Sequence, residues 1–159
     1  MPYQARPQVL FVDDDPDACE MFPLLMLPLE IDTTCVNSAA EAWIEINKQK
    51  FDLMVVDCWL PHLDGFEFCR QFRETDSMTP IIFYSGAAYD ADRQRGMAAG
   101  ANAYITKPDI VGLIAAVSTF IVKANAQRSI SRQAQHKPAF VGFSVAMAAL
   151  GARPVETKT

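Results

Sequence analysis

The sequence predicts an α/β protein built on a doubly wound sheet of five parallel strands. Short runs rich in β-branched and apolar residues alternate along the chain with segments of helical pattern, which is the order of repeated β–α units. Most of these runs are continuously apolar, as expected for parallel strands that helices cover on both faces. The strands are expected at residues 9–12, 33–36, 53–56, 81–84 and 103–106.

Residues that favour helix ends mark the expected helices. Asp15 can cap a helix whose first position is Pro16, and Ser38 opens a capping box that is completed by Glu41. Pro23 lies inside the first helix, which it is expected to kink or shorten. The helices are expected at residues 16–27, from 38, at 66–73, at 90–99 before Gly100, and from 109 onward.

The last helix carries an apolar stripe, and the chain beyond it is ambiguous. The stripe has the spacing of a single helix face, so that face is expected to pack on the sheet. Residues 123–138 could extend this helix or form a flexible basic linker, and the apolar segment 140–150 fits either a helix or a strand. The stripe consists of Ile110, Leu113, Ile114, Val117 and Ile121.

Charge divides the chain near Lys123. Residues 1–122 carry eight Lys and Arg against eighteen Asp and Glu, whereas residues 123–159 carry six against one. We therefore expect one domain over 1–122 and a basic extension over 123–159 with no recognisable output domain. The basic residues lack interleaved aromatics, and attraction to the acidic domain explains them equally well, so nucleic acid is not an expected partner.

Composition is that of a soluble globular protein, with 50% hydrophobic and 21% charged residues. The longest apolar stretches, 110–122 and 139–152, are shorter than the about 20 residues that a membrane span needs. No apolar segment of the signal-peptide type precedes the first acidic cluster, so a cytoplasmic location and no membrane insertion are expected. The cysteines show no Cys-x-x-Cys spacing, which favours reduced thiols over disulfides or zinc.

Polar residues follow four of the predicted strands at their carboxyl ends. Asp13 and Asp14 follow the first strand, and Asp57 follows the third. Ser85 follows the fourth strand and Lys107 the fifth. Open α/β sheets place their ligand sites beyond the carboxyl ends of the strands, so these side chains are expected to share one site. Together they outline a site for phosphoryl transfer.

These residue types suit the formation of an aspartyl phosphate. Asp57 is ionised at neutral pH and can attack phosphorus without a general base. A cation must offset repulsion from the anionic donor, and Asp13, Asp14 and a backbone carbonyl just after Asp57 could help to hold Mg²⁺. Lys107 would neutralise one phosphoryl oxygen, and Ser85 would donate a hydrogen bond to another.

The combined pattern resembles the receiver domain of response regulators, the phosphoacceptor module of two-component signalling. The matching elements cover roughly residues 8–122 and occur in the family's order: Asp13-Asp14, Asp57 in the form Asp-x-x-x-Pro-x-x-Asp-Gly, Ser85, Tyr104 and Lys107-Pro108. The resemblance implies a flavodoxin-like fold with strand order 2-1-3-4-5. It also implies Mg²⁺ at Asp13, Asp14, Asp57 and the backbone carbonyl of Trp59.

The resemblance further implies a switch and a set of partners. In such domains the phosphoryl group draws the hydroxyl at the position of Ser85 inward, and the aromatic at the position of Tyr104 follows. This repacks the face formed by the fourth helix, fifth strand and fifth helix. A sensor histidine kinase or phosphotransfer protein would donate the phosphoryl group, and a downstream protein would bind the switched face. Association into a homodimer stays open.

Two positions beside the expected route of an attacking water carry side chains that are not expected to orient one. Trp59 lies two residues after Asp57, and Ala87 lies two residues after Ser85. Our hypothesis is that Trp59 shields the acyl phosphate and lengthens its lifetime.

Two other classes of function fit part of the pattern. A phosphatase of the haloacid-dehalogenase type also uses an Asp nucleophile and Mg²⁺, but it needs a second Asp where Trp59 stands. An interaction module that is never phosphorylated is the main alternative, although such a site would be expected to have lost a charge. The sequence therefore favours a stand-alone response regulator that accepts a phosphoryl group on Asp57 and is not an enzyme.

Overall fold

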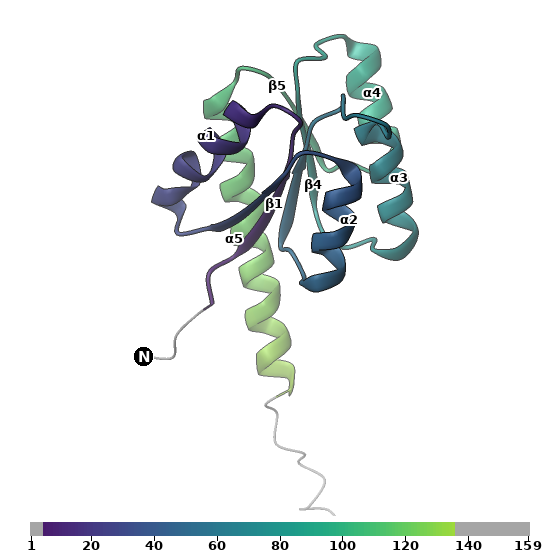
Figure 1. Ribbon diagram of the computed structural model, residues 1–159. Coiled ribbons are helices and arrows are strands. Elements are labelled where there is room, and N and C mark those ends of the chain that lie inside the picture. Colours follow the sequence, from purple (N-terminus) through teal and green to yellow (C-terminus); the bar gives the residue numbers. More distant parts are fainter. Residues whose placement is uncertain (1–4, 136–159) are drawn as a thin grey trace, which may run out of the picture. The chain divides into compact units, whose positions relative to one another are not determined.

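The computed structural model describes residues 5–135, so the segment 140–150 lies outside the described part of the chain. Strands and helices alternate along it (Figure 1). The strands are β1 (Gln8–Val12), β2 (Asp32–Val36), β3 (Leu53–Val56), β4 (Ile81–Ser85) and β5 (Ala103–Thr106). The helices are α1 (Pro16–Met26), the 3₁₀ helix η1 (Leu27–Leu29), α2 (Ala39–Lys48), α3 (Gly65–Thr75), α4 (Asp90–Ala98) and α5 (Ile110–Gln135).

The strands form one parallel sheet in the order β2-β1-β3-β4-β5, which confirms the predicted fold class and strand order. Val12 of β1 is paired with Val56 of β3, so these two strands end side by side. Ser85 of β4 is paired with Thr106 of β5 in the same way. The residues that follow these strands are therefore brought to one edge of the sheet.

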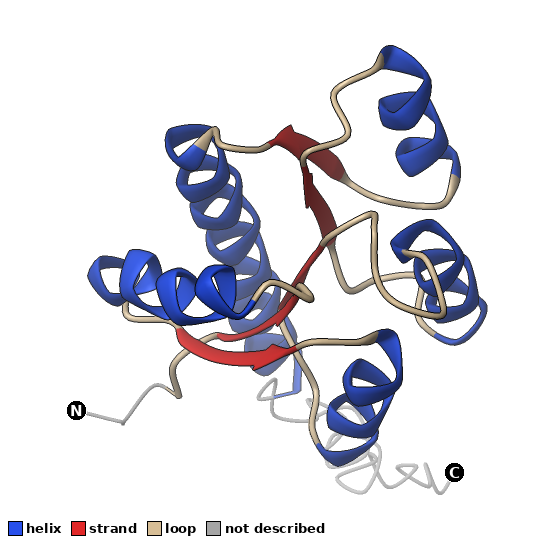
Figure 2. Cartoon of the chain, turned by 45° about the horizontal axis from the view of Figure 1, so that its top comes forward, coloured by secondary structure: helices blue, strands red, loops and turns tan. Residues whose placement is uncertain are grey.

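Helices cover both faces of the sheet, as the apolar strands predicted (Figure 2). On one face, α1 and α5 pack on β1, β3 and β4 through residues such as Phe22 and Leu113. The rings of Phe11 and Phe22 stack there with centroids 4.2 Å apart. On the other face, α2 and α3 pack on the sheet through residues such as Ala42 and Phe66. Burial on both sides explains why β3 has no polar side chain.

Pro23 does not end the first helix, which continues to Met26 and is followed directly by η1. Proline has no backbone N–H to donate to the preceding turn, so it weakens the helix locally. Phe22 and Met26 on either side of it are almost completely buried. Their packing on the sheet holds the helix together past the proline, which is why the expected shortening is not seen.

The last helix extends beyond the apolar stripe, as one of the two sequence readings allowed. α5 runs to Gln135, so residues 123–135 are helical and the flexible-linker reading is wrong for them. By length and composition, Ile110–Ser131 is the one helix in residues 5–135 that could cross a membrane. Leu113 and Val117 are nevertheless fully buried against the sheet. Core helices of soluble proteins meet the same criterion, so the finding is weak evidence for a span.

Candidate functional site

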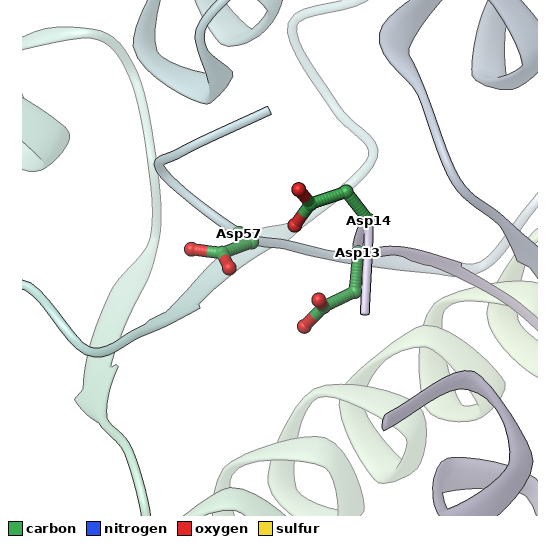
Figure 3. A group of neighbouring side chains, drawn as sticks. All are labelled: Asp13, Asp14 and Asp57. Atoms are coloured by element: carbon green, nitrogen blue, oxygen red, sulfur yellow. The ribbon is translucent and has the colours of Figure 1, made fainter. Parts of the chain in front are cut away.

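Three carboxylates meet at the carboxyl edge of the sheet (Figure 3). Asp13 and Asp14 follow β1, and Asp57 follows β3. One ligand oxygen from each lies within 4.8 Å of the other two. Asp13 and Asp57 are buried, with 0% and 8% of their surface exposed, whereas Asp14 is exposed. The structure thus brings together the three acids that the sequence had placed at separate strand ends.

Backbone hydrogen bonds between the strands fix the positions of the two buried acids. The amide of Asp57 donates to the carbonyl of Val12 at 2.9 Å, and the amide of Asp13 donates to the carbonyl of Val36 at 3.0 Å. Each aspartate is therefore held as the first residue beyond its strand. The positions of the carboxylates are set by the sheet more than by the loops that follow.

Lys107 lies between the two buried carboxylates. Its Nζ is 2.6 Å from Oδ2 of Asp13 and 3.0 Å from Oδ2 of Asp57. Burial by itself would lower the pKa of Lys107, but the hydrogen bonds to Asp13 and Asp57 outweigh it and raise that pKa. Burial raises the pKa of Asp13, and the hydrogen bond from Lys107 offsets only part of this effect. The lysine is therefore a protonated cation beside two acids at neutral pH.

Ser85 and Tyr104 both contact the loop after β4. Ser85 is fully buried, and its Oγ accepts a hydrogen bond from the amide of Ala87 at 3.4 Å. The hydroxyl of Tyr104 donates to the carbonyl of Ala87 at 2.7 Å, and the ring is only 5% exposed. The amide of Lys107 donates to the carbonyl of Ser85 at 2.9 Å. Ala87 therefore joins the two residues that the sequence placed in the switch.

The loop after Asp57 is held by a close backbone contact at Gly65. The amide of Gly65 donates to the carbonyl of Cys58 at 2.9 Å. A Cβ at this position would overlap the carbonyl oxygen of Asp57 and lie 3.0 Å from its carbonyl carbon, so only glycine fits without a shift. Asp64 caps α3 by accepting from the amide of Glu67 at 2.8 Å. Asp64 and Gly65 therefore form the turn and helix cap that open α3.

Trp59 stands at the outer side of this loop. Its side chain is 55% exposed, and its ring meets Phe66 edge-on with centroids 6.4 Å apart. Its amide donates to Oδ1 of Asp57 at 3.3 Å. The residue is thus next to the carboxylate that it was predicted to shield, and the metal-binding role of its carbonyl stays a prediction.

The donor set fits Mg²⁺. Hard divalent cations take oxygen ligands, and Mg²⁺ is usually held by one or two carboxylates with further oxygens from substrate and water. Asp13, Asp14 and Asp57 offer carboxylate oxygens close enough to share one ion. No thiol or imidazole belongs to this group within residues 5–135, so the site does not suit zinc or another softer metal.

Contacts from α4 were not predicted from the sequence. Arg93 and Arg95 are exposed. Arg93 also donates from Nη1 to the carbonyl of Tyr104 at 2.9 Å. Arg95 forms an ion pair with Asp64 at 2.9 Å, and its guanidinium carbon lies 4.3 Å from the ring centroid of Phe66. The helix is thereby tied to β5 and to the start of α3.

Comparison with known proteins identifies the family. The sequence model of the response regulator receiver domain matches residues 9–118. A gliding motility regulatory protein of Myxococcus xanthus is 32% identical over 111 residues, covering 69% of this chain and 14% of that protein. The DNA-binding response regulator MtrA of Mycolicibacterium smegmatis is 31% identical over 103 residues, covering 65% of this chain and 45% of MtrA. The chain thus spans less than half the length of these relatives.

Solved structures agree in fold. The receiver domain of the Francisella response regulator 1452 has a TM-score of 0.70 and 30% identity, over 74% of this chain and 98% of that one. The receiver domain of the sensor histidine kinase PA1611 of Pseudomonas aeruginosa has a TM-score of 0.66 and 28% identity, over 74% and 98%. That structure has a magnesium ion coordinated in its active-site cleft. The chain described here belongs to the response regulator receiver domain family of two-component signalling.

Proposed function

We propose that this chain accepts a phosphoryl group on Asp57 from a phosphohistidine of a sensor kinase or phosphotransfer protein. The observation that carries the proposal is the position of the Asp57 carboxylate, which is buried next to Lys107 and within 4.8 Å of two further carboxylate ligands. Phosphoryl transfer needs a nucleophile and positive charge to offset that of the phosphoryl oxygens. Here the Asp57 carboxylate is the nucleophile, Lys107 is a cation beside it, and the cluster of carboxylates could bind a metal ion.

The side chains of the site would position and neutralise the reacting groups. The ammonium of Lys107 and the amide of Trp59 hold the two oxygens of Asp57, which orients the carboxylate. An oxygen of Asp57 forms the new bond to phosphorus while the bond from phosphorus to the donor imidazole breaks, and no proton has to leave Asp57. Lys107 has three N–H donors, so it can also contact a phosphoryl oxygen.

Asp13, Asp14 and Asp57, with the backbone carbonyl of Trp59, are the residues that would hold Mg²⁺. When bound there, the ion supplies positive charge that reduces repulsion between the carboxylate and the incoming phosphoryl oxygens. The oxygen-only side-chain donor set supports this assignment, and so does the magnesium ion in the receiver domain of PA1611.

The loop after β4 would carry the signal away from Asp57. A phosphoryl oxygen can accept a hydrogen bond from Ser85, which changes the long contact between Ser85 Oγ and the amide of Ala87. The carbonyl of Ala87 accepts from Tyr104, so movement of this loop is felt by that ring. A local charge event would then alter the face of α4, β5 and α5 that a downstream protein binds.

The remaining features of the proposal follow from the family. The protein would be a cytoplasmic phosphoacceptor without enzymatic turnover, with the receiver over residues 1–122 and residues 123–159 as an extension. MtrA is named a DNA-binding response regulator, but the chain matches only 45% of it, so DNA binding is not extended to this protein.

Intact mass spectrometry after incubation with acetyl phosphate tests the proposal. We expect one phosphoryl adduct that requires Mg²⁺, that is absent from Asp57→Asn, and that persists in Asp17→Asn, a control at an exposed acid of α1. An unmodified wild-type chain under these conditions would instead indicate an interaction module that works without phosphorylation. An adduct that Asp57→Asn retains would assign the phosphoryl group to another residue.

A further inference from the structure

We propose that Asn37 and Cys19 are positioning residues for the Mg²⁺ site, because together they hold the peptide bond that joins Asp13 to Asp14. The inference rests on the proposed Mg²⁺ site and adds two side chains that would not touch the ion. Both would act through the backbone of Asp13 and so set where the carboxylate of Asp14 lies. Loss of either should weaken Mg²⁺ binding without unfolding the protein.

Asp14 has the least support of the three proposed carboxylate ligands. The carboxylates of Asp13 and Asp57 each accept a hydrogen bond from Lys107, at 2.6 and 3.0 Å. Each also accepts one from a backbone amide, at 3.0 and 3.3 Å. Asp14 is exposed, and no residue between 5 and 135 donates a hydrogen bond to its carboxylate. The position of this carboxylate therefore depends on the backbone that carries it.

The peptide bond between Asp13 and Asp14 is held at its carbonyl oxygen. Nδ2 of Asn37 donates to this oxygen at 2.9 Å, and Sγ of Cys19 donates to it at 3.4 Å. Asn37 directly follows β2, whereas Cys19 lies on α1, so two different elements hold the oxygen. Figure 3 shows the carboxylates of Asp13 and Asp14 leaving the chain in different directions. Rotation of this peptide would change the position of Asp14 relative to Asp13.

The two donors also contact each other. Nδ2 of Asn37 donates to Sγ of Cys19 at 3.4 Å. An amide nitrogen carries two N–H groups, and a thiol can donate one hydrogen bond while it accepts another, so the three contacts are compatible. Because a backbone carbonyl only accepts hydrogen bonds, the nitrogen of the Asn37 amide, and not its oxygen, faces Asp13. The carbonyl of Asp13 thus has a donor for each of its two lone pairs.

Backbone contacts place both donors before any ion binds. The amide of Asp13 donates to the carbonyl of Val36 at 3.0 Å, which fixes β1 beside the residue that precedes Asn37. The amide of Asn37 donates to the carboxylate of Glu41 on α2 at 2.9 Å. Burial raises the pKa of the Cys19 thiol, so this group keeps its proton at neutral pH. The link between the loops after β1 and β2 is therefore already formed in the protein without metal.

Titration of the full chain with Mg²⁺ alone tests the inference, followed by isothermal calorimetry and by the amide signal of Asp14 in nuclear magnetic resonance. Asn37→Ala should raise the dissociation constant about 3- to 10-fold, as expected when a residue that supports a metal ligand loses its hydrogen bond. Cys19→Ala should raise it less, because a thiol is a weak donor. Cys19→Ser keeps a donor and should bring the dissociation constant back towards that of the wild type.

Two variants match these changes away from the site. Gln49→Ala removes an exposed amide that donates to Thr34 of β2 at 3.4 Å. Cys69→Ala removes a thiol that donates to the carbonyl of Ala99 at 3.3 Å. Neither variant should change the dissociation constant for Mg²⁺. Urea unfolding without Mg²⁺ shows whether each variant is folded.

A double variant separates the positioning of Asp14 from a general loss of structure. Asp14→Asn should itself weaken Mg²⁺ binding. Adding Asn37→Ala to it should then change the dissociation constant by less than about two-fold, because the ligand through which Asn37 acts has been removed. A purely structural defect would instead have its full effect in the double variant.

Either of two results would overturn the inference. One is a wild-type dissociation constant in folded Asn37→Ala, and the other is fully additive effects of Asp14→Asn and Asn37→Ala. A wild-type chain that binds no Mg²⁺ would overturn the inference together with the metal site. The titrations use no phosphoryl donor, so a chain that binds Mg²⁺ as described but gains no phosphoryl adduct would count against the proposed function alone.

Discussion

Lys107 and Asp13 form an ion pair with Nζ and Oδ2 only 2.6 Å apart, although 94 positions separate them in the chain. The Asp13 side chain is fully buried, whereas 25% of the Lys107 side chain is exposed. A buried carboxylate is strongly destabilised when it has no cation beside it. The pair is therefore a structural requirement of the site as well as part of its chemistry.

Removing this cation should destabilise the protein. We expect Lys107→Ala to lower the free energy of unfolding by up to about 3 kcal/mol at neutral pH without Mg²⁺, because neighbouring acids are left uncompensated. Mg²⁺ should then raise the melting temperature of the variant more than that of the wild type. Lys48→Ala, which removes an exposed pair with Glu45, should change stability by less than about 1 kcal/mol in the same urea titration. Equal losses in both variants would contradict this account.

Gly65 and Gly86 offer a matched test of the loop that follows Asp57. A methyl group at Gly65 would collide with the backbone of Asp57, so Gly65→Ala should cost about 1–3 kcal/mol and slow phosphorylation. No atom lies within 4 Å of a Cβ built at Gly86, so Gly86→Ala should leave stability nearly unchanged. Urea unfolding of the two variants makes the comparison. A wild-type stability for Gly65→Ala would show that the loop can relax.

Trp59 should lengthen the lifetime of the aspartyl phosphate. Its side chain is exposed beside Asp57 and has no hydrogen-bond acceptor, so it is not expected to orient an attacking water. We expect Trp59→Asn to speed loss of the phosphoryl group several-fold, while Trp59→Phe keeps most of the shielding. The adduct is followed over time by intact mass after the phosphoryl donor is removed. Comparable rates in the wild type and Trp59→Asn would rule the shielding hypothesis out.

Asp76 should contribute stability that depends on pH. Its carboxylate accepts from the amide of Met78 at 2.7 Å, and from the amide and hydroxyl of Thr79 at 2.8 and 2.7 Å. Burial alone would raise the pKa of Asp76, but these hydrogen bonds outweigh it and lower the pKa. A carboxyl group whose pKa is lower in the folded than in the unfolded state stabilises the protein fully at pH values above its pKa in the unfolded state. This stabilisation is lost as the pH falls through the pKa of the folded state.

The matching experiment compares Asp76→Asn with the wild type at several pH values. At pH 7 the variant should be less stable by about 1 kcal/mol, because the charge-assisted hydrogen bonds are weakened. The two unfolding free energies should converge in acid, where the wild-type carboxyl is also neutral. Glu74→Gln, at an exposed position in the last turn of α3, two residues before Asp76, serves as the control. A constant difference between Asp76→Asn and the wild type at every pH would contradict the assignment.

The core of the site could be predicted because it depends on strand ends. Apolar runs stop directly before Asp13 and Asp57, and Lys107 follows the strand that ends at Thr106. Parallel strands bring their carboxyl ends to one edge of the sheet. Knowing where each strand stops was therefore sufficient to bring these residues together. The length of α5 was left open, because polar residues with good helix propensity also suit a linker.

The contacts around Tyr104 could not be predicted in the same way. Arg93 and Cys58, which contact Tyr104, lie 11 and 46 positions away from it in the chain. The contact with Arg93 depends on how α4 lies on the sheet. Arg95 and Asp64 are 31 positions apart for the same reason. Gly96 was the available signal, since a glycine inside a helical pattern often marks close packing.

The pairing of Val12 with Val56 gives the site a mechanical property that its neighbouring loops lack. Adjacent strands of a sheet are held about 4.8 Å apart by backbone hydrogen bonds, whatever side chains they carry. The distance between Asp13 and Asp57 is set by the backbone hydrogen bonds of the sheet. The position of Tyr104 depends instead on side-chain contacts with a separate helix, α4. The edge that would bind the cation is thus stiff, and the face that would meet a partner is deformable.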